Sequence, residues 1–402
     1  MEIQSLAQNG RSSNFFIEGE DQTLLKVSLL EALAPGKTAE LKIDFTVDIP
    51  HAYGRLGWHE DIFALSRWYP ILSVLDEGGW HNHPFYPFHR PFFSEAAYYS
   101  VALTVPANQV VIHSGQLKAT QSHDNKTQTL TVETPLPIRE FTLAMSPRYQ
   151  VLEGDSKTVK IKSFYLPGDE ARAQEALDDA ADLMRYYIQR LGVYPYPELS
   201  IAPVYLGYGG EQMSNMIFID TRVYRLPRFL MRYFDFLIAH ETGHQWFYNL
   251  VGVDEYSQMW LEEGMNSYFL LEHLEDKYGK DVPVIHWPKG LDWFFPNFSF
   301  RHASSTRYKM IARTGLDRPI MGELSSFREP SSIFSLTYGK GSKVVSMLRR
   351  QIGEEAFGGV FKRIFAEYRF KNLSLEDFIR ICEEESGQSL KWFFDEWLQT
   401  AQ

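Results

Sequence analysis

Short apolar stretches separated by turn residues fill the chain up to about Tyr149. Stretches of this kind, typical of β-strands, lie at residues 24–30, 39–49, 98–105, 130–133 and 141–145. Between them, Ala34-Pro35-Gly36 and Val105-Pro106-Ala107-Asn108 have sequences typical of turns. The pattern predicts antiparallel strands and therefore a β-sheet-rich amino-terminal region.

The pattern changes after Glu153-Gly154-Asp155-Ser156, which is typical of a linker. Residues 158–165 are strand-like, 170–191 predict a long helix, and Tyr194-Pro195-Tyr196-Pro197 leads into another strand. The later part is mainly helical and ends with a helix over 392–398. We therefore predict an α+β chain with two domains, a β-rich one over 1–155 and an α/β one over 156–402.

A helix with an interrupted apolar face is predicted after Pro227, which sits where a first helical turn would begin. Its buried face is marked at steps of four and three by Leu230, Phe234 and Leu237. The same rhythm continues to Glu241 and His244, with His240 alongside. Buried polar groups need partners, and a metal ion is a partner for both imidazoles at once.

The spacing of these polar residues predicts a catalytic zinc site. His240 and His244, four apart on a helix, point the same way, and Glu263 from a second helix can complete three ligands. The fourth position stays open for water, on which Glu241 can act. The alternatives are a hydrogen-bonded pair of core histidines and a surface position for Glu263, although its apolar neighbours argue against the latter.

Composition narrows the function classes. The chain has 402 residues, of which 44% are hydrophobic, enough for two or three domains. A net charge of −11 without a long basic run argues against nucleic-acid binding. The single cysteine, Cys382, excludes internal disulfides and a cysteine-based zinc finger.

Location is predicted from what the sequence lacks. No apolar run approaches the roughly 18 residues of a membrane-spanning helix, and residues 1–10 carry no signal pattern. We expect no membrane insertion of this chain and a cytoplasmic location. The alternative is a soluble domain of a longer or membrane-attached protein.

Residues 240–251 (His-Glu-Thr-Gly-His-Gln-Trp-Phe-Tyr-Asn-Leu-Val) and Trp260-Leu261-Glu262-Glu263-Gly264 resemble the zinc signature of the gluzincin aminopeptidases, the family of aminopeptidase N and leukotriene hydrolase. The resemblance implies one Zn²⁺ per chain held by His240, His244 and Glu263, with Glu241 as general base. It also implies a peptide substrate and a thermolysin-like α/β catalytic domain behind the β-rich one. No oligomeric state is predicted.

A second matching segment is Thr337-Tyr338-Gly339-Lys340-Gly341, which is similar to the family's Tyr-x-Lys-Gly. The resemblance implies that the Tyr338 hydroxyl donates a hydrogen bond to the oxyanion that forms during attack. One alternative, the tail of a phosphate-binding loop, lacks a glycine five positions before Gly339. The other alternative is a turn tyrosine before a helix over 343–351.

A third segment, Gly207 to Asp220, departs from the family's Gly-x-Met-Glu-Asn strand, whose glutamate holds the substrate's ammonium. Aligned by its glycines, this chain has Gln212 at the glutamate position; aligned on Met213 and Asn215, it has Ser214. Glu211 is adjacent but would face away unless a bulge re-aims it. We expect the edge at Gly209 and Gly210 to pair with peptide, with Glu211 and Gln212 beside it.

Three functions stay open. An aminopeptidase that releases amino-terminal residues is predicted first, and an endopeptidase or blocked-peptide hydrolase second, because Gln212 is not an acid. The third is a non-catalytic scaffold. Since the chain stops where the family's catalytic domain normally ends, we expect either a compact member or a segment of a longer polypeptide.

Two further groups of residues are candidates without an assigned role. The prolines and aromatics over 80–93 predict a loop bordering the cleft, with His81 and His83 as rim residues; a second metal site including His89 is the alternative. Candidate walls of a side-chain pocket are Tyr205, Tyr208 and residues 293–295.

Overall fold

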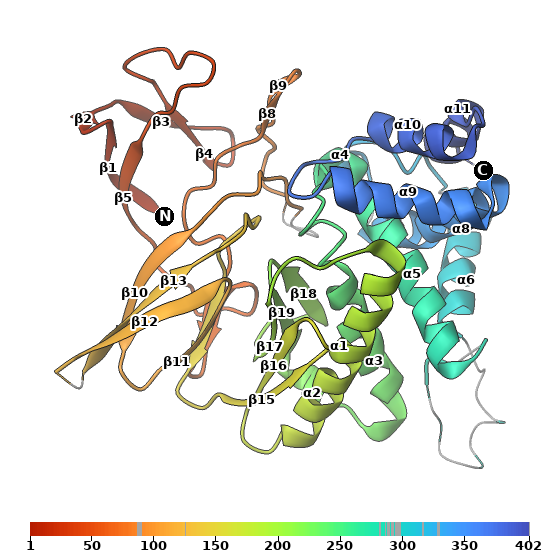
Figure 1. Cartoon of the computed structure of the whole chain (residues 1–402), viewed down its shortest axis with the longest axis horizontal. Coiled ribbons are helices and arrows are strands. Elements are labelled where there is room, and N and C mark those ends of the chain that lie inside the picture. The colour runs from red at the N-terminus through yellow and green to blue at the C-terminus, as the bar shows by residue number, and fades with distance from the viewer. Residues whose placement is uncertain are drawn as a thin grey trace.

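The computed structural model describes residues 1–86, 91–124, 126–280, 283–285, 287, 290, 293, 299–315, 317–327 and 330–401. Its amino-terminal part is built of small antiparallel sheets, in red to yellow in Figure 1. They comprise β1 (Glu2–Gln8), β2 (Arg11–Ser12) and β5 (Leu41–Thr46); β3 (Phe15–Glu18) with β4 (Leu24–Val27); β8 (Leu75–Asp76) with β9 (Gly79–Trp80); and β10 (Ser100–Pro106), β13 (Thr127–Glu133) and β12 (Gln116–His123). The predicted β-rich amino-terminal region is confirmed.

A four-stranded antiparallel sheet connects this part to the rest of the chain. Its order is β11 (Val110–His113), β14 (Leu143–Ser146), β7 (Ile62–Leu65) and β6 (Leu56–His59). Ala64 and Ile112 of this sheet pack against Ala202 and Phe218 of the next. The two sheets therefore share one hydrophobic layer.

That next sheet is mixed and has the order β15 (Gln150–Asp155), β16 (Lys160–Tyr165), β17 (Glu198–Val204), β19 (Met216–Asp220) and β18 (Gly210–Met213). Strands β16, β17 and β19 are parallel, and the two outer strands run antiparallel to them. The hairpin of β15 and β16 spans the predicted domain boundary at residue 155, and the division there stays a prediction. Strand β18 lies at the edge of the sheet.

Helix α1 (Glu170–Leu191) lies between β16 and β17 in sequence, the other helices follow the sheet, and together they form the other half of the molecule (Figure 1). Helix α1 has the predicted bounds, and the histidine helix α3 (Met231–Gly243) follows one 3₁₀ turn, η1 (Arg228–Leu230). The remaining helices are α2 (Thr221–Tyr224), α4 (Glu255–Gln258), α5 (Trp260–Tyr278), α6 (Phe300–Arg313), the 3₁₀ turn η2 (Leu324–Ser326), α7 (Pro330–Ile333), the π-helical η3 (Phe334–Lys340), α8 (Gly341–Ile352), α9 (Glu354–Glu367), α10 (Leu375–Ser386) and α11 (Lys391–Gln399). Among the described helices, none is both long and apolar enough to cross a bilayer.

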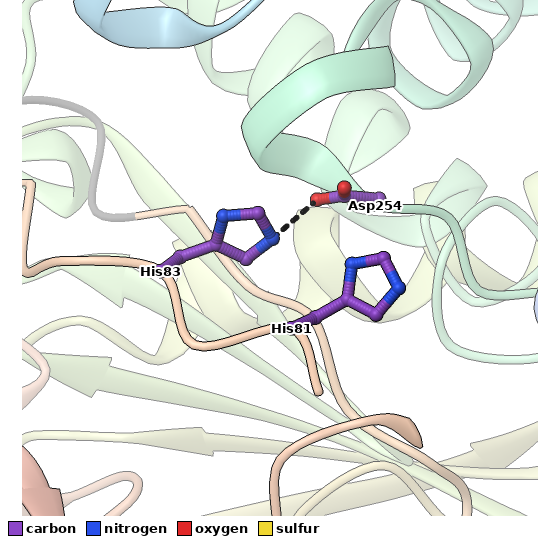
Figure 2. Close-up of side chains that lie close together, drawn as sticks. All are labelled: His81, His83 and Asp254. Carbon is purple, nitrogen blue, oxygen red and sulfur yellow. Dashed lines mark ion pairs between the residues drawn. The ribbon is translucent and has the colours of Figure 1, made fainter. Parts of the chain in front are cut away.

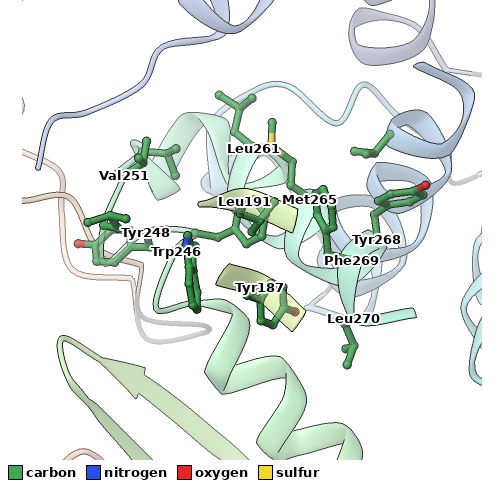
Figure 3. Packing of buried hydrophobic residues seen from close by; sticks show 14 of the residues in the cluster. Tyr187, Leu191, Trp246, Tyr248, Val251, Leu261, Met265, Tyr268, Phe269 and Leu270 are labelled. Carbon is green, nitrogen blue, oxygen red and sulfur yellow. The ribbon is translucent and has the colours of Figure 1, made fainter. Parts of the chain in front are cut away.

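One large core holds these helices together. Figure 3 shows Tyr187 and Leu191 of α1 against Trp246, which follows α3, with Met265 and Phe269 of α5 beside them. Trp246 is fully buried, and its ring lies 5.3 Å from that of Tyr187. Because burial of an aromatic side chain contributes about 2–3 kcal/mol, this packing fixes α3 and α5 relative to each other.

Candidate active site

The end of α3 and the start of α5 bring His240, His244 and Glu263 together. His240 Nε2 and His244 Nε2 lie 3.2 Å apart, and Glu263 Oε2 lies 3.5 and 3.4 Å from them, respectively. Ligands about 2.0–2.1 Å from a tetrahedral zinc ion would lie about 3.3 Å from one another. The three predicted ligand atoms therefore fit the triangular face of such a coordination sphere.

Two residues that the sequence analysis did not single out orient the histidines. Glu262 Oε1 lies 2.7 Å from His244 Nδ1, on the side of the ring opposite the cluster. The side-chain amide of Asn266 donates to the His240 carbonyl at 3.0 Å and faces its Nδ1 at 3.3 Å. Such contacts fix ring orientation at metal sites. Only their position could have indicated this role in the sequence, because Glu262 and Asn266 flank Glu263 on one predicted helix.

Glycines allow the two helices and the tyrosine segment to approach closely. A Cβ on Gly243 would lie 2.0 Å from Asn266 Oδ1, and one on Gly264 would lie 3.0 Å from the Cα of Gly341. The first contact lets Asn266 reach His240, and the second sets the start of α8 against α5. Gly243 and Gly264 therefore allow the close helix contacts that position the side chains of the site.

Glu241 points into the same space. Burial raises the pKa of its carboxyl to about 8, the charges of Glu211 and Glu263 add to the shift, and His244 opposes it. A nearby dication would lower this pKa again. The donor set of two imidazoles and crowded acids therefore suits a divalent cation.

Tyr338 also lies at the cluster. Its hydroxyl donates a hydrogen bond to Glu263 Oε1, and its ring stacks on His240 with 5.8 Å between centroids. Burial raises the pKa of the phenol well above its usual value, and Glu263 adds to this, so the hydroxyl stays a donor at neutral pH. The residue belongs to the π-helical η3, and the reading as a turn tyrosine is wrong.

Lys340 is structural in its contacts. Its side chain is 1% exposed, and its ammonium lies 3.5 Å from Asp317 Oδ1 and donates to the carbonyls of Arg318 and Thr400 at 3.3 and 3.0 Å. These contacts hold the carboxy-terminal end of the chain near η3, and they occupy the ammonium that a phosphate would need. The phosphate-loop reading therefore has no geometric support.

A pocket of about 740 Å³ opens onto the cluster. Its walls come from α3, α5 and β18, together with Arg55 and Phe92 of the amino-terminal part. Of the candidate wall residues, Tyr208 lines this pocket, whereas Tyr205 packs against Tyr53. Residues 294 and 295 lie outside the described part of the chain, as does His89.

The predicted substrate edge follows one wall of the pocket. Gly209, Gly210, Glu211 and Gln212 all line it, whereas Ser214 is buried and bonds to Asn249. The pocket therefore supports the alignment that places Gln212, rather than Ser214, at the family's glutamate position. Strand β18 keeps an unbroken register with β19, so Glu211 reaches the pocket without a bulge.

The polar groups of this wall are already bonded within the protein. Glu211 accepts from Arg55 Nη1 and from the Tyr208 hydroxyl, both at 2.7 Å. Gln212 accepts from Asn249 at 2.8 Å, and its amide faces Glu262 Oε1 at 3.4 Å. A substrate amine at this wall would therefore meet a carboxylate that already carries a partner.

Comparison with known proteins gives matches in sequence and in structure. The family model described as the peptidase family M1 domain matches residues 177–397, more than half of the chain. Aminopeptidase M1-B of Oryza sativa subsp. japonica is 25% identical over 325 residues, which cover 76% of this chain and 35% of that protein. Aminopeptidase N of Streptomyces lividans is 30% identical over 165 residues, 41% of this chain and 18% of that protein.

Among solved structures, an M1 zinc metallopeptidase from Deinococcus radiodurans matches with a TM-score of 0.70 and 17% identity. The match covers 100% of this chain and 84% of that one. A mutant of that enzyme, solved with a Tyr-Ser-Ala substrate, matches with a TM-score of 0.67 and 16% identity. The chain spans about a third of the length of the rice aminopeptidases that it matches.

Proposed function

The chain belongs to the peptidase M1 family, and from this membership and its pocket we propose that it is a zinc-dependent aminopeptidase that releases amino-terminal residues from peptides. The observation that carries the proposal is the triangle of His240, His244 and Glu263 atoms, 3.2–3.5 Å apart, with Glu241 beside it in the pocket. This arrangement supports the predicted zinc ligands. Glu262 and Asn266 act as positioning residues for the two imidazoles.

The chemistry proposed for this site is hydrolysis of an amide. When bound, zinc supplies a Lewis acid that polarises the scissile carbonyl and makes water more acidic. Glu241 takes a proton from the attacking water, whose oxygen bonds to the carbonyl carbon. As the carbon–nitrogen bond breaks, Glu241 returns that proton to the leaving amine. Tyr338 donates to the carbonyl oxygen while negative charge develops there.

Substrate binding is proposed at the outer edge of β18. This strand pairs with β19 on one side only and lines the pocket on the way to Glu241. An extended peptide can add to such an edge through backbone hydrogen bonds, as at Gly209 and Gly210. This mode leaves side-chain preference to the pocket walls.

The close approach of β18 to the proposed base Glu241 gives a first test. A Cβ on Gly210 would lie 2.8 Å from Glu241 Oε1, so Gly210→Ala must displace the carboxylate. We expect kcat/KM to fall about 10–100-fold, because small displacements of a reacting group are costly, with unchanged zinc content and Tm. The matched control is Gly358→Ala on α9, whose Cβ would meet nothing within 4 Å. Unchanged kcat/KM in Gly210→Ala would contradict the placement of Glu241.

Charge in the pocket favours an amine terminus over a carboxylate one. Besides the zinc ligands and Glu241, its described lining contains Glu211, Glu255 and Glu262 but a single arginine, Arg55. An ammonium group is therefore attracted to this wall. We propose that the amino end of the substrate lies along Glu211 and Gln212.

The same wall favours a second candidate, an endopeptidase or blocked-peptide hydrolase. Gln212 carries no charge, and Glu211 already accepts from Arg55 and Tyr208. A charge-assisted contact to an ammonium is worth about 1.5–3 kcal/mol, so its loss would weaken selection for a free amine without affecting hydrolysis.

Two fluorogenic peptides that differ only in acetylation of the amino terminus distinguish these functions. We expect cleavage of the free peptide alone, and its abolition by a chelator and recovery with Zn²⁺. Equal cleavage of both peptides would establish the second candidate. Absence of cleavage by protein with one bound zinc would point to the remaining alternative, a non-catalytic scaffold. A cytoplasmic location remains a prediction and is tested by cell fractionation.

A further inference from the structure

A second group of metal-ligand side chains lies outside the proposed catalytic site. His81 and His83 come from the loop after β9, and Asp254 comes from the turn before α4, far along the chain. Figure 2 shows the three side chains converging from the two segments. One potential ligand atom from each lies within 4.8 Å of the others. The sequence pairs the histidines, but only the fold adds the acid.

The spacing of these atoms suits a small divalent ion. His83 Nε2 lies 3.4 Å from Asp254 Oδ1, close to the roughly 3.3 Å between neighbouring ligands of a tetrahedral ion. The other separations are at most 4.8 Å, so these atoms would approach one another by about 1.5 Å at most around such an ion. The side chains are 26%, 17% and 10% exposed, so water can complete the coordination sphere.

Each ligand is held by a neighbour that leaves one atom directed at the others. His81 Nε2 bonds to Asp76 Oδ2 at 2.7 Å, so its Nδ1 is the atom available for an ion. The His83 ring stacks on Tyr256 at 4.0 Å and 9°. Asp254 accepts from the Tyr256 amide at 2.9 Å and from the Ser257 hydroxyl at 2.7 Å. Carboxylate-bonded imidazoles of this kind are typical of metal ligands.

A simple ion pair accounts for only part of this arrangement. His83 Nε2, a buried atom, lies 3.4 Å from Asp254 Oδ1 but makes no hydrogen bond within the described part of the chain. The pair of His83 and Asp254 gives no role to the other nitrogen of His81, whose ring centroid lies 5.9 Å from that of His83. A dication bonds to two neutral imidazoles and one carboxylate together.

We propose that His81, His83 and Asp254 form a second metal site, separate from the catalytic one, for a divalent transition ion such as zinc, cobalt or nickel. Mixed imidazole and carboxylate donors select ions of this class over calcium or magnesium. The ion clamps the loop after β9 onto the first turn of α4. The next residue, Glu255, lines the catalytic pocket and accepts from the Phe92 amide at 2.7 Å, so the clamp stabilises the rim of that pocket. This site does not depend on the proposed peptidase activity.

The test counts ions in protein that carries no affinity tag. The protein is stripped with a chelator and titrated with Co²⁺ or Zn²⁺, with bound metal measured by mass spectrometry after gel filtration. We expect two equivalents for the wild type and one for His83→Phe, which keeps a ring against Tyr256 but removes the ligand atom. His123→Ala, which replaces a half-buried histidine elsewhere in the amino-terminal part, should keep both.

A second measurement isolates the new site and controls for folding. In a His240→Ala, His244→Ala background, one equivalent should remain, and Zn²⁺ should raise the Tm. Adding Asp254→Asn, whose amide oxygen can still cap α4, should abolish both effects. A wild type that binds one ion only, or a second equivalent that survives both His83→Phe and Asp254→Asn, would overturn the proposal. A wild type that binds both ions but hydrolyses no peptide would instead contradict the proposed function alone.

Discussion

Glu241→Gln is expected to bind one zinc ion at the catalytic site as the wild type does and to lose nearly all turnover. Glutamine keeps the size and one oxygen of the side chain but cannot take a proton from water. General acid–base groups contribute about 10²–10⁴-fold, so kcat should fall by that factor. The burial and neighbouring acids that raise the pKa of Glu241 to about 8 place this carboxyl in the range where a dication can tune it. Zinc content and kcat measured on the same preparation check the expectation.

The matched control is Glu272→Gln, the same change on α5 outside the pocket lining. Glu272 pairs with Arg301 and Arg349, so its loss affects surface ion pairs rather than proton transfer. We expect kcat within about threefold of the wild type, because such pairs contribute about 1 kcal/mol or less to stability. Normal turnover in Glu241→Gln would refute the assignment of the base.

Local pattern was enough for the elements whose sequence repeats over several turns. The helix over 170–191 was predicted with its observed bounds, and its buried residues recur along one face over several turns. Strands β6 and β7 were not predicted, since each has four residues and their pairing depends on a turn between them. The π-helical η3 was likewise missed, because its geometry comes from packing against α5 and α6.

The contacts of the site likewise divide into those that the local sequence predicted and those that depend on the fold. His240 and Glu241 lie in α3 with His244 at its C-cap, and Glu263 sits in a strong motif, so spacing and motif together predicted that they meet. The partner of Glu211 could not be predicted, because Arg55 lies far away in sequence and reaches it through the amino-terminal sheets. The contact between Asp254 and His83 could not be predicted for the same reason, because the two residues lie far apart in sequence. Contacts between distant segments need the fold, whereas contacts within one helix do not.

Tyr338→Phe is expected to lower kcat about 10²–10³-fold with little change in KM. The hydroxyl is proposed to donate to the carbonyl oxygen more strongly in the transition state than in the bound substrate, and removal of one such donor has effects of this size. The ring should stay in place, because it stacks on His240 and packs against Phe334. Steady-state kinetics on the free-amine peptide measure both constants.

Loss of the hydrogen bond to Glu263 is the competing explanation for such an effect, since Tyr338 also touches a proposed zinc ligand. Metal analysis separates the two, because a donor role predicts an unchanged zinc content whereas a loosened ligand predicts a lower one. Tyr233→Phe is the control, since it removes a hydroxyl from another tyrosine lining the pocket and should leave kcat within about threefold of the wild type. An effect of Tyr338→Phe confined to KM would mean that the hydroxyl binds substrate and transition state equally, and the proposed oxyanion role would then be wrong.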